Sequence, residues 1–377
     1  MPVRALARVN LAAIERNVAH LRGGLADGAR LCAVVKADAS GHGAGPAARA
    51  SLAGGATQLA VATATEAAQL RAAGITAPLL VMGALSSQEL PIALEARAEV
   101  VAWDQRFVAD VVAAGARSRA PLRVHVKYDS GMGRLGTRDL DDAIELAERL
   151  LSAGPSVTLA GAMTHFATAD GDPAFFAAQL EAFRPFAAQL RRRVPGLVVH
   201  AANSAATVRD RGSHFDLVRC GIAIYGCDPM NCDPDDYGLE PALELTSYVA
   251  AVKRARAGES VGYGRRFVAD RDTWIATLPI GYADGIRRAL SDNCDVLIAG
   301  RRYPLVGTVS MDNVTVSLGS ESAVGIGARA TIIGRDGAER QTVEDLANRI
   351  GTIAHEVLCG ITARVPREYH SDGVPVP

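Results

Sequence analysis

From residue 31 to about residue 225, short apolar runs alternate with longer, alanine-rich stretches that have helical spacing. The apolar runs are LCAVV (31–35), QLAVA (58–62), PLLVM (78–82), AEVVA (98–102), LRVHV (122–126), TLAGAM (158–163), LVVHA (197–201) and FDLVR (215–219). Eight such repeats predict eight parallel strands joined by helical crossovers. The pattern therefore predicts an α/β fold whose N-terminal part is a TIM-like (β/α)8 barrel.

The stretches between these runs are expected to be helices. The clearest are residues 63–74, 104–116, 139–151 and 172–194. An open, doubly wound sheet is the alternative arrangement of the same strand–helix repeats. No GxGxxG motif follows the first apolar run, and its absence argues mildly against a dinucleotide-binding fold.

The sequence pattern changes after about residue 238. Apolar runs such as TWIATLPIG, CDVLIAG, YPLVGTVSM and RATIIG are now punctuated by Gly, Asp and Asn. TVEDLANRIG alone predicts a helix, with Thr342 as its N-cap and Gly351 after its end. We therefore expect two domains, a barrel over residues 1–238 and a mostly-β domain over residues 239–377.

Composition narrows the classes of function. The chain has 377 residues and a formal net charge of -1, so nothing indicates binding to nucleic acid or to an acidic membrane. No apolar stretch approaches the ~20 residues that span a bilayer, and no signal peptide precedes the first run. The six cysteines are scattered without a CxxC pair, so no metal site is expected. These features predict a cytoplasmic protein.

Lysine is rare in this chain. Among 40 basic residues only Lys36, Lys127 and Lys253 are lysines. Arginine satisfies most roles that need only a positive charge, so a lysine that persists draws attention to its amine chemistry. Chance explains Lys253 better, whereas Lys36 and Lys127 each end a predicted strand.

Other polar residues also fall at strand ends, which in a barrel lie together at the C-terminal face. After Lys36 and Lys127 these are Arg134, His165, His200 and Arg219. Taken singly, His200 is more often a buried core histidine, and Arg219 is as easily an ion-pair partner. Their joint placement at five strand ends favours a site. The small-residue loops AANSAAT, which contains Asn203 and Ser204, and CGIAIYG suit a phosphate, since loops seven and eight commonly bind one.

Nine segments resemble the alanine racemase family and follow that family's order over nearly the whole chain. They are VVKADASGHG, VHVKYDSGMGRLG, MTHFATAD, HAANSAA, VRCGIAIYG, VGYGRRF, LPIGYADG, VGTVSMDNV and CGITARVPR. The resemblance implies a barrel that binds pyridoxal 5'-phosphate (PLP), a C-terminal β domain and a homodimer with shared active sites. It implies an isomerase that interconverts L- and D-alanine.

The resemblance also implies roles for individual residues. Lys36 would bind the cofactor covalently and exchange a proton on one face of the substrate Cα, and Tyr263 of the partner subunit would serve the other face. Arginine cannot replace Lys36, because it is never deprotonated in proteins. The cofactor phosphate would be held by Asn203, Ser204, Gly221 and Ile222.

The remaining roles concern the pyridine ring and the substrate. Arg219 would face the pyridine nitrogen, with His165 and His200 orienting it by hydrogen bonds. Arg134 and the backbone N–H of Met311 would bind the substrate carboxylate, and Tyr282 would line the entrance. Lys127 matches a lysine that is often carbamylated in the family.

Three positions depart from the family pattern. Ser40 stands where the family usually has a tyrosine, and Ala363 stands where some members have one. Thr308 replaces an arginine that is common in the family. Smaller side chains there suggest weaker cofactor binding and a wider pocket, so a racemase of a larger amino acid such as serine, or a low-activity PLP-binding relative, stays open. A decarboxylase of the same barrel type would carry an acid in place of Arg219, and a non-catalytic PLP carrier would lack the second domain.

Overall fold

The computed structural model describes residues 3–118 and 120–376, and these form two compact units. One unit comprises Ile14–Ala39 and Ala44–Ile224. The other takes in the chain up to Ala13, Ser40–Gly43 and the chain from Tyr225 onward. The expected division into residues 1–238 and 239–377 differs from this one, because the first strand of the chain packs with the C-terminal half.

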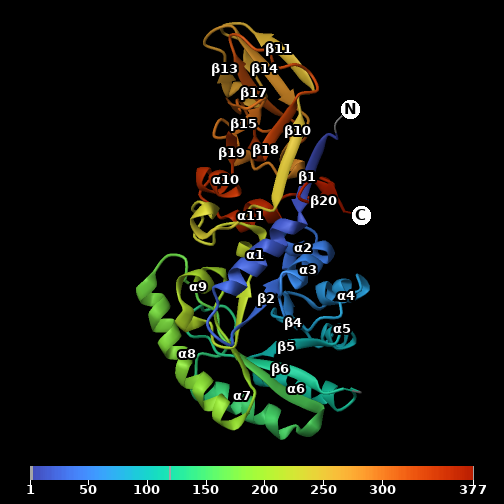
Figure 1. Cartoon of the computed structure of the whole chain (residues 1–377), viewed down its shortest axis with the longest axis vertical. Helices are drawn as coiled ribbons and strands as arrows, with labels where there is room; N and C mark the ends of the chain where they lie inside the picture. Colours follow the sequence, from blue (N-terminus) through green and yellow to red (C-terminus); the bar gives the residue numbers. More distant parts are fainter. Residues whose placement is uncertain (1–2, 119, 377) are drawn as a thin grey trace. The chain divides into compact units, whose positions relative to one another are not determined.

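The first unit is an eight-stranded parallel barrel (Figure 1). Its strands are β2 (Arg30–Val34), β3 (Gln58–Val61), β4 (Leu79–Val81), β5 (Ala98–Ala102), β6 (Leu122–Lys127), β7 (Val157–Met163), β8 (Val198–His200) and β9 (Leu217–Cys220). Each strand from β2 to β7 pairs with the next one in sequence, and β9 pairs with β2. Arg219 N–H donates to Ala202 O at 2.9 Å, which brings β9 to the β8 side and nearly closes the barrel. The barrel prediction is confirmed. The doubly wound alternative is wrong, because the strand order never reverses.

The helices of this unit are α1 (Leu11–Gly23), the short α2 (Lys36–Ser40), α3 (Ala44–Ala53), α4 (Ala64–Ala72), α5 (Leu90–Glu95), α6 (Gln105–Gly115), α7 (Leu140–Ser152), α8 (Pro173–Arg193) and α9 (Ser204–Arg209). Five of them, α4 and α6 to α9, begin at residues whose side chains cap them. Asp104, Asp139 and Asp172 accept backbone N–H groups at the starts of α6, α7 and α8. In α7 the buried residues are Ala143, Leu146, Ala147 and Leu150, the spacing of one helical face.

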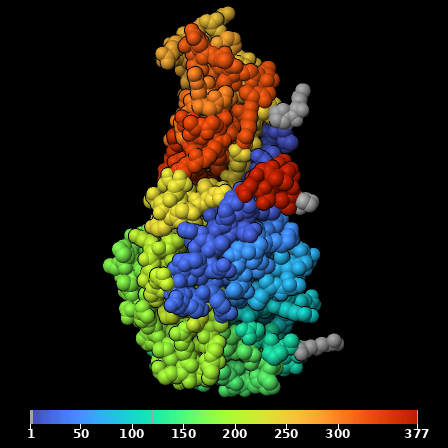
Figure 2. Space-filling model, in the orientation of Figure 1, coloured from blue at the N-terminus to red at the C-terminus, as the bar shows by residue number. Residues whose placement is uncertain are grey.

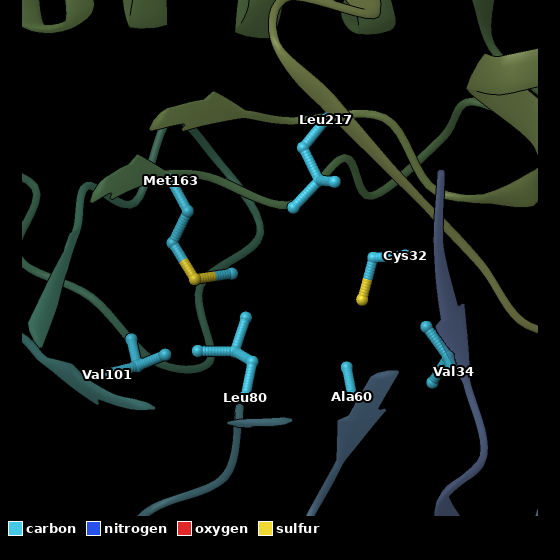
Figure 3. Close-up of a cluster of buried hydrophobic side chains, with 7 residues drawn as sticks. All are labelled: Cys32, Val34, Ala60, Leu80, Val101, Met163 and Leu217. Atoms are coloured by element: carbon cyan, nitrogen blue, oxygen red, sulfur yellow. The ribbon is translucent and has the colours of Figure 1, made fainter. Parts of the chain in front are cut away.

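The inside of the barrel is partly an apolar core. Figure 3 shows side chains from six of its strands pointing toward one another: Cys32, Val34, Ala60, Leu80, Val101, Met163 and Leu217. Such packing fills the barrel with side chains and leaves no open pore. Polar residues of the same strands occupy other parts of the interior, and they are described below.

The second unit is mostly β, as predicted. Its largest sheet has the order β16-β15-β18-β10-β1-β20-β21, with β19 paired to β18. Two smaller sheets have the orders β11-β14-β17 and β12-β13. The strands are β1 (Ala5–Asn10), β10 (Leu243–Tyr248), β11 (Ala251–Ala255), β12 (Ser260–Val261), β13 (Phe267–Val268), β14 (Thr273–Leu278), β15 (Asp295–Ile298), β16 (Arg301–Pro304), β17 (Val314–Gly319), β18 (Arg329–Asp336), β19 (Glu339–Gln341), β20 (Arg367–Ser371) and β21 (Val374–Pro375).

Strand β1 joins this sheet from the other end of the chain. It pairs antiparallel with β10 and parallel with β20, and Figure 2 shows the blue N-terminal and red C-terminal segments together on the surface of this unit. The expected helix is α10 (Val343–Arg349), with Thr342 and Asp345 forming a capping box. A second helix, α11 (Ala354–Cys359), was not predicted, because its N-cap Ile353 gives no capping signal. Among the described residues, no helix is both long and apolar enough to cross a membrane.

Candidate active site

A cavity of about 200 Å3 lies at the C-terminal ends of the barrel strands. Its lining residues are Lys36, Ala62, Met82, Gly83, Lys127, Arg134, Leu135, Met163, His165 and Arg219. The structure thus brings five of the residues predicted from strand ends around one space. Four of them are basic, and this excess of positive charge suits a ligand that carries several anionic groups.

Lys36 stands at the start of a strained turn. The three residues after it, Ala37, Asp38 and Ala39, have φ values of 52°, 51° and 56°, in the left-handed region. Left-handed helical backbone costs about 1–2 kcal/mol for each non-glycine residue, and such strain gathers at functional sites. Two side-chain contacts hold the turn: Ala37 N–H donates to Glu66 Oε1 at 2.7 Å, and Ala44 N–H donates to Asp38 Oδ1 at 2.7 Å. Strand β2 before Lys36 and the turn after it therefore fix the backbone position of Lys36.

Arg219 is buried, with 3% of its surface exposed. Its guanidinium donates to His200 Nδ1 at 3.0 Å, to His165 Nδ1 at 3.2 Å and to the carbonyls of Thr164 and Ala201 at 2.8 and 3.0 Å. Burial lowers the pKa of Arg219 to about 10, which still leaves it a cation at neutral pH. None of these hydrogen-bond partners is a carboxylate.

Both histidines beside Arg219 are neutral. Burial, together with the charge of Arg219, lowers the pKa of His165 and that of His200 well below the usual range. Their Nδ1 atoms face guanidinium donors, so both rings carry their proton on Nε2. The orienting role expected for the two histidines fits this geometry.

Backbone amide groups gather around Ser204, between the end of β9 and the start of α9. Asn203 caps α9 by accepting from Ala206 N–H at 3.0 Å. Ser204 Oγ accepts from Gly221 N–H at 2.9 Å and from Ala223 N–H at 3.4 Å. Ile222 begins the short turn η3 (Ile222–Tyr225) between those two donors. Amide donors converging beside a helix start are suited to a phosphate.

Lys127 is 4% exposed and stands near three other cations, Arg219, Arg134 and Lys36. Burial, then the charges of Arg219 and Arg134, lowers the pKa of Lys127 to about 8. Arg134 is exposed, and no hydrogen bond or ion pair joins its side chain to another part of the described chain. The site therefore has room for an anion between Lys127 and Arg134.

Sequence reasoning missed the residue that shapes the loop carrying Arg134. The Asp129 carboxylate accepts from the backbone N–H groups of Gly131 and Gly133 at 3.1 and 2.9 Å, and from Arg138 Nε at 3.1 Å. Aspartate followed by glycines is a turn signal, and DSGMG displays it. Asp129 thus orders this loop.

Three predicted site residues lie in the other unit and are exposed there. The exposed fractions are 74% for Tyr263, 53% for Met311 and 41% for Tyr282. One loop ties them together: Thr308 Oγ1 donates to Tyr263 O at 3.0 Å, and Tyr282 N–H donates to Ser310 O at 2.9 Å. Large exposed side chains grouped on one surface mark an interaction site.

Comparisons with known proteins agree along the whole chain. Residues 9–229 match the profile of the alanine racemase N-terminal domain, and residues 242–369 match that of the C-terminal domain. Alanine racemase 1 of Bacillus subtilis is 38% identical over 97% of this chain and 93% of its own length. The alanine racemase of Thermobifida fusca is 41% identical over 97% and 98%.

Solved structures give the same result. The alanine racemase from Streptomyces lavendulae has a TM-score of 0.93 and 38% identity, covering 98% of each chain. The alanine racemase from Bacillus anthracis with bound L-Ala-P has a TM-score of 0.92 and 37% identity, covering 100% of this chain and 97% of that one.

Proposed function

Because the chain belongs to the alanine racemase family, we propose that it interconverts L- and D-alanine with PLP as its cofactor. The observation that carries the proposal is the set of basic groups around one small cavity. Lys36, Lys127, Arg134 and Arg219 fit a ligand bearing a phosphate, an aldehyde and, with substrate, a carboxylate. PLP, when bound, supplies an electron sink that makes the substrate Cα–H acidic.

Each residue has a task in this proposal. Ser204 and the amide groups of Gly221 and Ile222 hold the cofactor phosphate beside Asn203. Lys36 would hold the cofactor through its amine, and the same Nζ, when free, would move a proton on one face of the substrate Cα. Arg219 would face the pyridine nitrogen of the cofactor as a donor that keeps its own proton, because its pKa of about 10 leaves it charged at neutral pH. With Arg219 in place of an acid, the cofactor would supply a weaker electron sink, which would favour return of the proton to Cα over side reactions.

The second proton needs a group on the opposite face of Cα. We assign it to the hydroxyl of Tyr263 of the partner subunit in a homodimer. The exposure of Tyr263, Tyr282 and Met311 on one surface supports this, because a partner's site would bury them. Arg134 and the Met311 N–H then bind the substrate carboxylate, and Tyr282 lines the entrance.

The direct test is the reaction itself. Purified protein incubated with L-alanine in deuterated water should yield D-alanine that carries deuterium at Cα. A screen of other L-amino acids in parallel measures specificity. Protein that binds PLP yet neither inverts nor labels any amino acid would contradict the proposal.

Carbamylation of Lys127 is the first prediction. A pKa of about 8 leaves part of the amine neutral, and the neutral amine adds CO2 to form a carbamate with release of a proton. The resulting anion would pair with Arg134, and such hydrogen bonds contribute about 1.5–3 kcal/mol. We expect Lys127→Arg to lower kcat/KM by about 10- to 100-fold.

The measurement is 13C NMR of protein equilibrated with 13C-bicarbonate. The wild-type protein should show a carbamate carbon that Lys127→Arg loses. The exposed Lys253 provides the matched control, since Lys253→Arg should keep both the signal and the activity. A signal that survives in Lys127→Arg would rule out this assignment.

Substrate breadth is the second prediction. Ala363 is exposed and Thr308 is half-buried, in place of larger residues of the family pattern. Apolar pockets discriminate between substrates by only about 1–3 kcal/mol per methylene. Smaller side chains at these two positions are therefore expected to change the order of substrate preference. We expect measurable racemisation of serine, and we expect Ala363→Tyr to reduce it relative to alanine. Ser40→Tyr should instead tighten PLP binding. Strict alanine specificity in the parent protein, unchanged by Ala363→Tyr, would exclude the wider pocket.

A further inference from the structure

A chain of hydrogen bonds runs through the barrel interior from Arg219 to a carboxylate. Arg219 Nη1 contacts His200 Nδ1 at 3.0 Å, and His200 Nε2 contacts His125 Nδ1 at 2.8 Å. His125 Nε2 then contacts Glu99 Oε2 at 2.6 Å. The two imidazole rings meet edge to face, at 84°, and both histidines are 1% exposed or less.

The direction of every hydrogen bond in this chain follows from its ends. Arginine only donates, so His200 Nδ1 accepts and its proton sits on Nε2. His200 Nε2–H donates to His125 Nδ1, which must therefore be unprotonated. His125 is then neutral, and its Nε2–H donates to Glu99. A proton on Nδ1 of either ring would set two donors against each other.

Glu99 is an ionised anchor for the chain. Its other contacts are Arg123 Nε at 2.6 Å and Gln58 Nε2 at 3.1 Å. Burial would raise the pKa of Glu99, but the hydrogen bonds from His125 and Arg123, together with the charge of Arg123, lower that pKa below its usual range. The carboxylate is thus charged at neutral pH and accepts from three side chains.

The anchor lies away from the cavity that holds Lys36. Glu99 and Arg123 line a second cavity, of about 670 Å3, at the N-terminal ends of the barrel strands. Arg30, Arg71 and Arg97 share that lining, with Glu95 as its other carboxylate. The hydrogen-bonded chain therefore connects the two mouths of the barrel.

The neighbouring strand is shaped to admit the His125 ring. The pairing of β6 with β7 shifts register between Val124 and His125. A Cβ on Gly161 of β7 would lie 2.1 Å from His125 Nδ1 and 2.8 Å from the carbonyl of Val198. Only glycine fits at position 161, so the backbone is adapted to this chain of side chains.

We propose that Glu99 is a positioning residue that acts through His125 and His200 to fix the hydrogen-bonding direction of Arg219 and to balance its charge. The direct partners of Arg219 are neutral, and the nearest ionised acceptor along the chain is two imidazoles away. Arg219 thereby stays a cation without a carboxylate that would compete for its donors. The consequence for the cofactor rests on the proposed function, whereas the direction of the chain rests on geometry alone.

The first test is 15N NMR of histidine-labelled, full-length protein as purified. In the wild type at about pH 7, both His125 and His200 should give the 15N signals of neutral rings that carry their proton on Nε2, as the hydrogen-bond directions require. Glu99→Leu removes the final acceptor and should shift the signals of both rings. Glu95→Leu, in the same cavity wall but outside the chain, should leave them in place. Doubly protonated, cationic rings in the wild type would overturn the proposal, and so would unchanged signals in Glu99→Leu.

The second test follows PLP affinity by absorbance titration. Glu99→Leu should weaken PLP binding about tenfold, the effect of losing about 1.4 kcal/mol at Arg219. Glu99→Gln keeps an acceptor for His125 and should show a smaller loss, while Glu95→Leu should match the wild type. Equal affinity in all variants would refute the charge balance. Failure of racemisation in a wild type with the expected imidazole tautomers would count against the proposed function and leave the direction of the chain intact.

Discussion

Replacing Lys36 by arginine is expected to abolish racemisation although the positive charge is kept. Arginine is never deprotonated in a protein, so it neither bonds to the cofactor aldehyde nor accepts a proton from Cα. The expected loss of kcat is on the order of 10⁴-fold, since proton transfer by a positioned group alone contributes about 10²–10⁴-fold. Lys36→Ala should be equally inactive, and both variants should lose the absorbance of covalently bound PLP.

Two controls separate amine chemistry from damage to the fold. The thermal unfolding midpoint should change little, because Lys36 lies beside a cavity and the turn after it is held by Glu66 and Asp38. Lys253→Arg makes the same change of side chain at an exposed position and should keep full activity. An active Lys36→Arg enzyme would refute the role given to Lys36.

Removing the hydroxyl of Tyr263 is expected to have the second largest effect. Tyr263 is 74% exposed, and it is tied to its loop through its carbonyl and not through its ring, so Tyr263→Phe should leave the fold unchanged. Loss of one proton-transfer group predicts a fall in kcat of about 10²–10⁴-fold. In Tyr263→Phe, deuterium exchange at Cα of the enantiomer whose proton Lys36 removes should decrease less than the rate of inversion does.

Subunit mixing tests whether Tyr263 acts on its partner's site. Equal amounts of Lys36→Ala and Tyr263→Phe protein should regain activity after subunit exchange, because each heterodimer has one site with both groups. About a quarter of all sites should be restored. No recovery, once exchange is verified, would mean that each site uses groups of one chain.

The matched control is the double variant Lys36→Ala, Tyr263→Phe mixed with wild type. With shared sites, each heterodimer formed from these two chains has no complete site, so added double variant should lower the activity of the wild type. With sites built from one chain, the wild-type subunit of each heterodimer should keep its activity. Shared sites therefore predict recovery of activity in the first mixture and loss of activity in the second. Sites built from one chain predict neither change.

The sequence alone determined the repeating parts of the barrel. Strand and helix periods are local properties, so runs such as AEVVA and LRVHV predicted β5 and β6 without knowledge of their neighbours. Capping residues such as Asp104 and Thr342 marked helix starts for the same reason. Because parallel strands end on one face, the order of residues also predicted that Lys36, Lys127 and Arg219 would meet.

Tertiary structure decided which elements pair. The neighbours of β1 are β10 and β20, which lie more than 230 residues away along the chain, and no local pattern assigns that strand to the second unit. The sequential strand order that excluded the doubly wound sheet is likewise a property of pairing. Periodicity gives the type of an element, and only long-range packing gives its partners.

The link from Arg219 to Glu99 shows the same limit at the level of side chains. His125 precedes Lys127 by two residues, so the sequence placed both on one face of a strand. The sequence contains no signal that His200, 75 residues further on, donates a hydrogen bond to the His125 ring. Nor does it indicate that Glu99 is the last acceptor in the series of hydrogen bonds. Hydrogen bonds between strands depend on register and on the space left by Gly161, and both are set when the barrel closes.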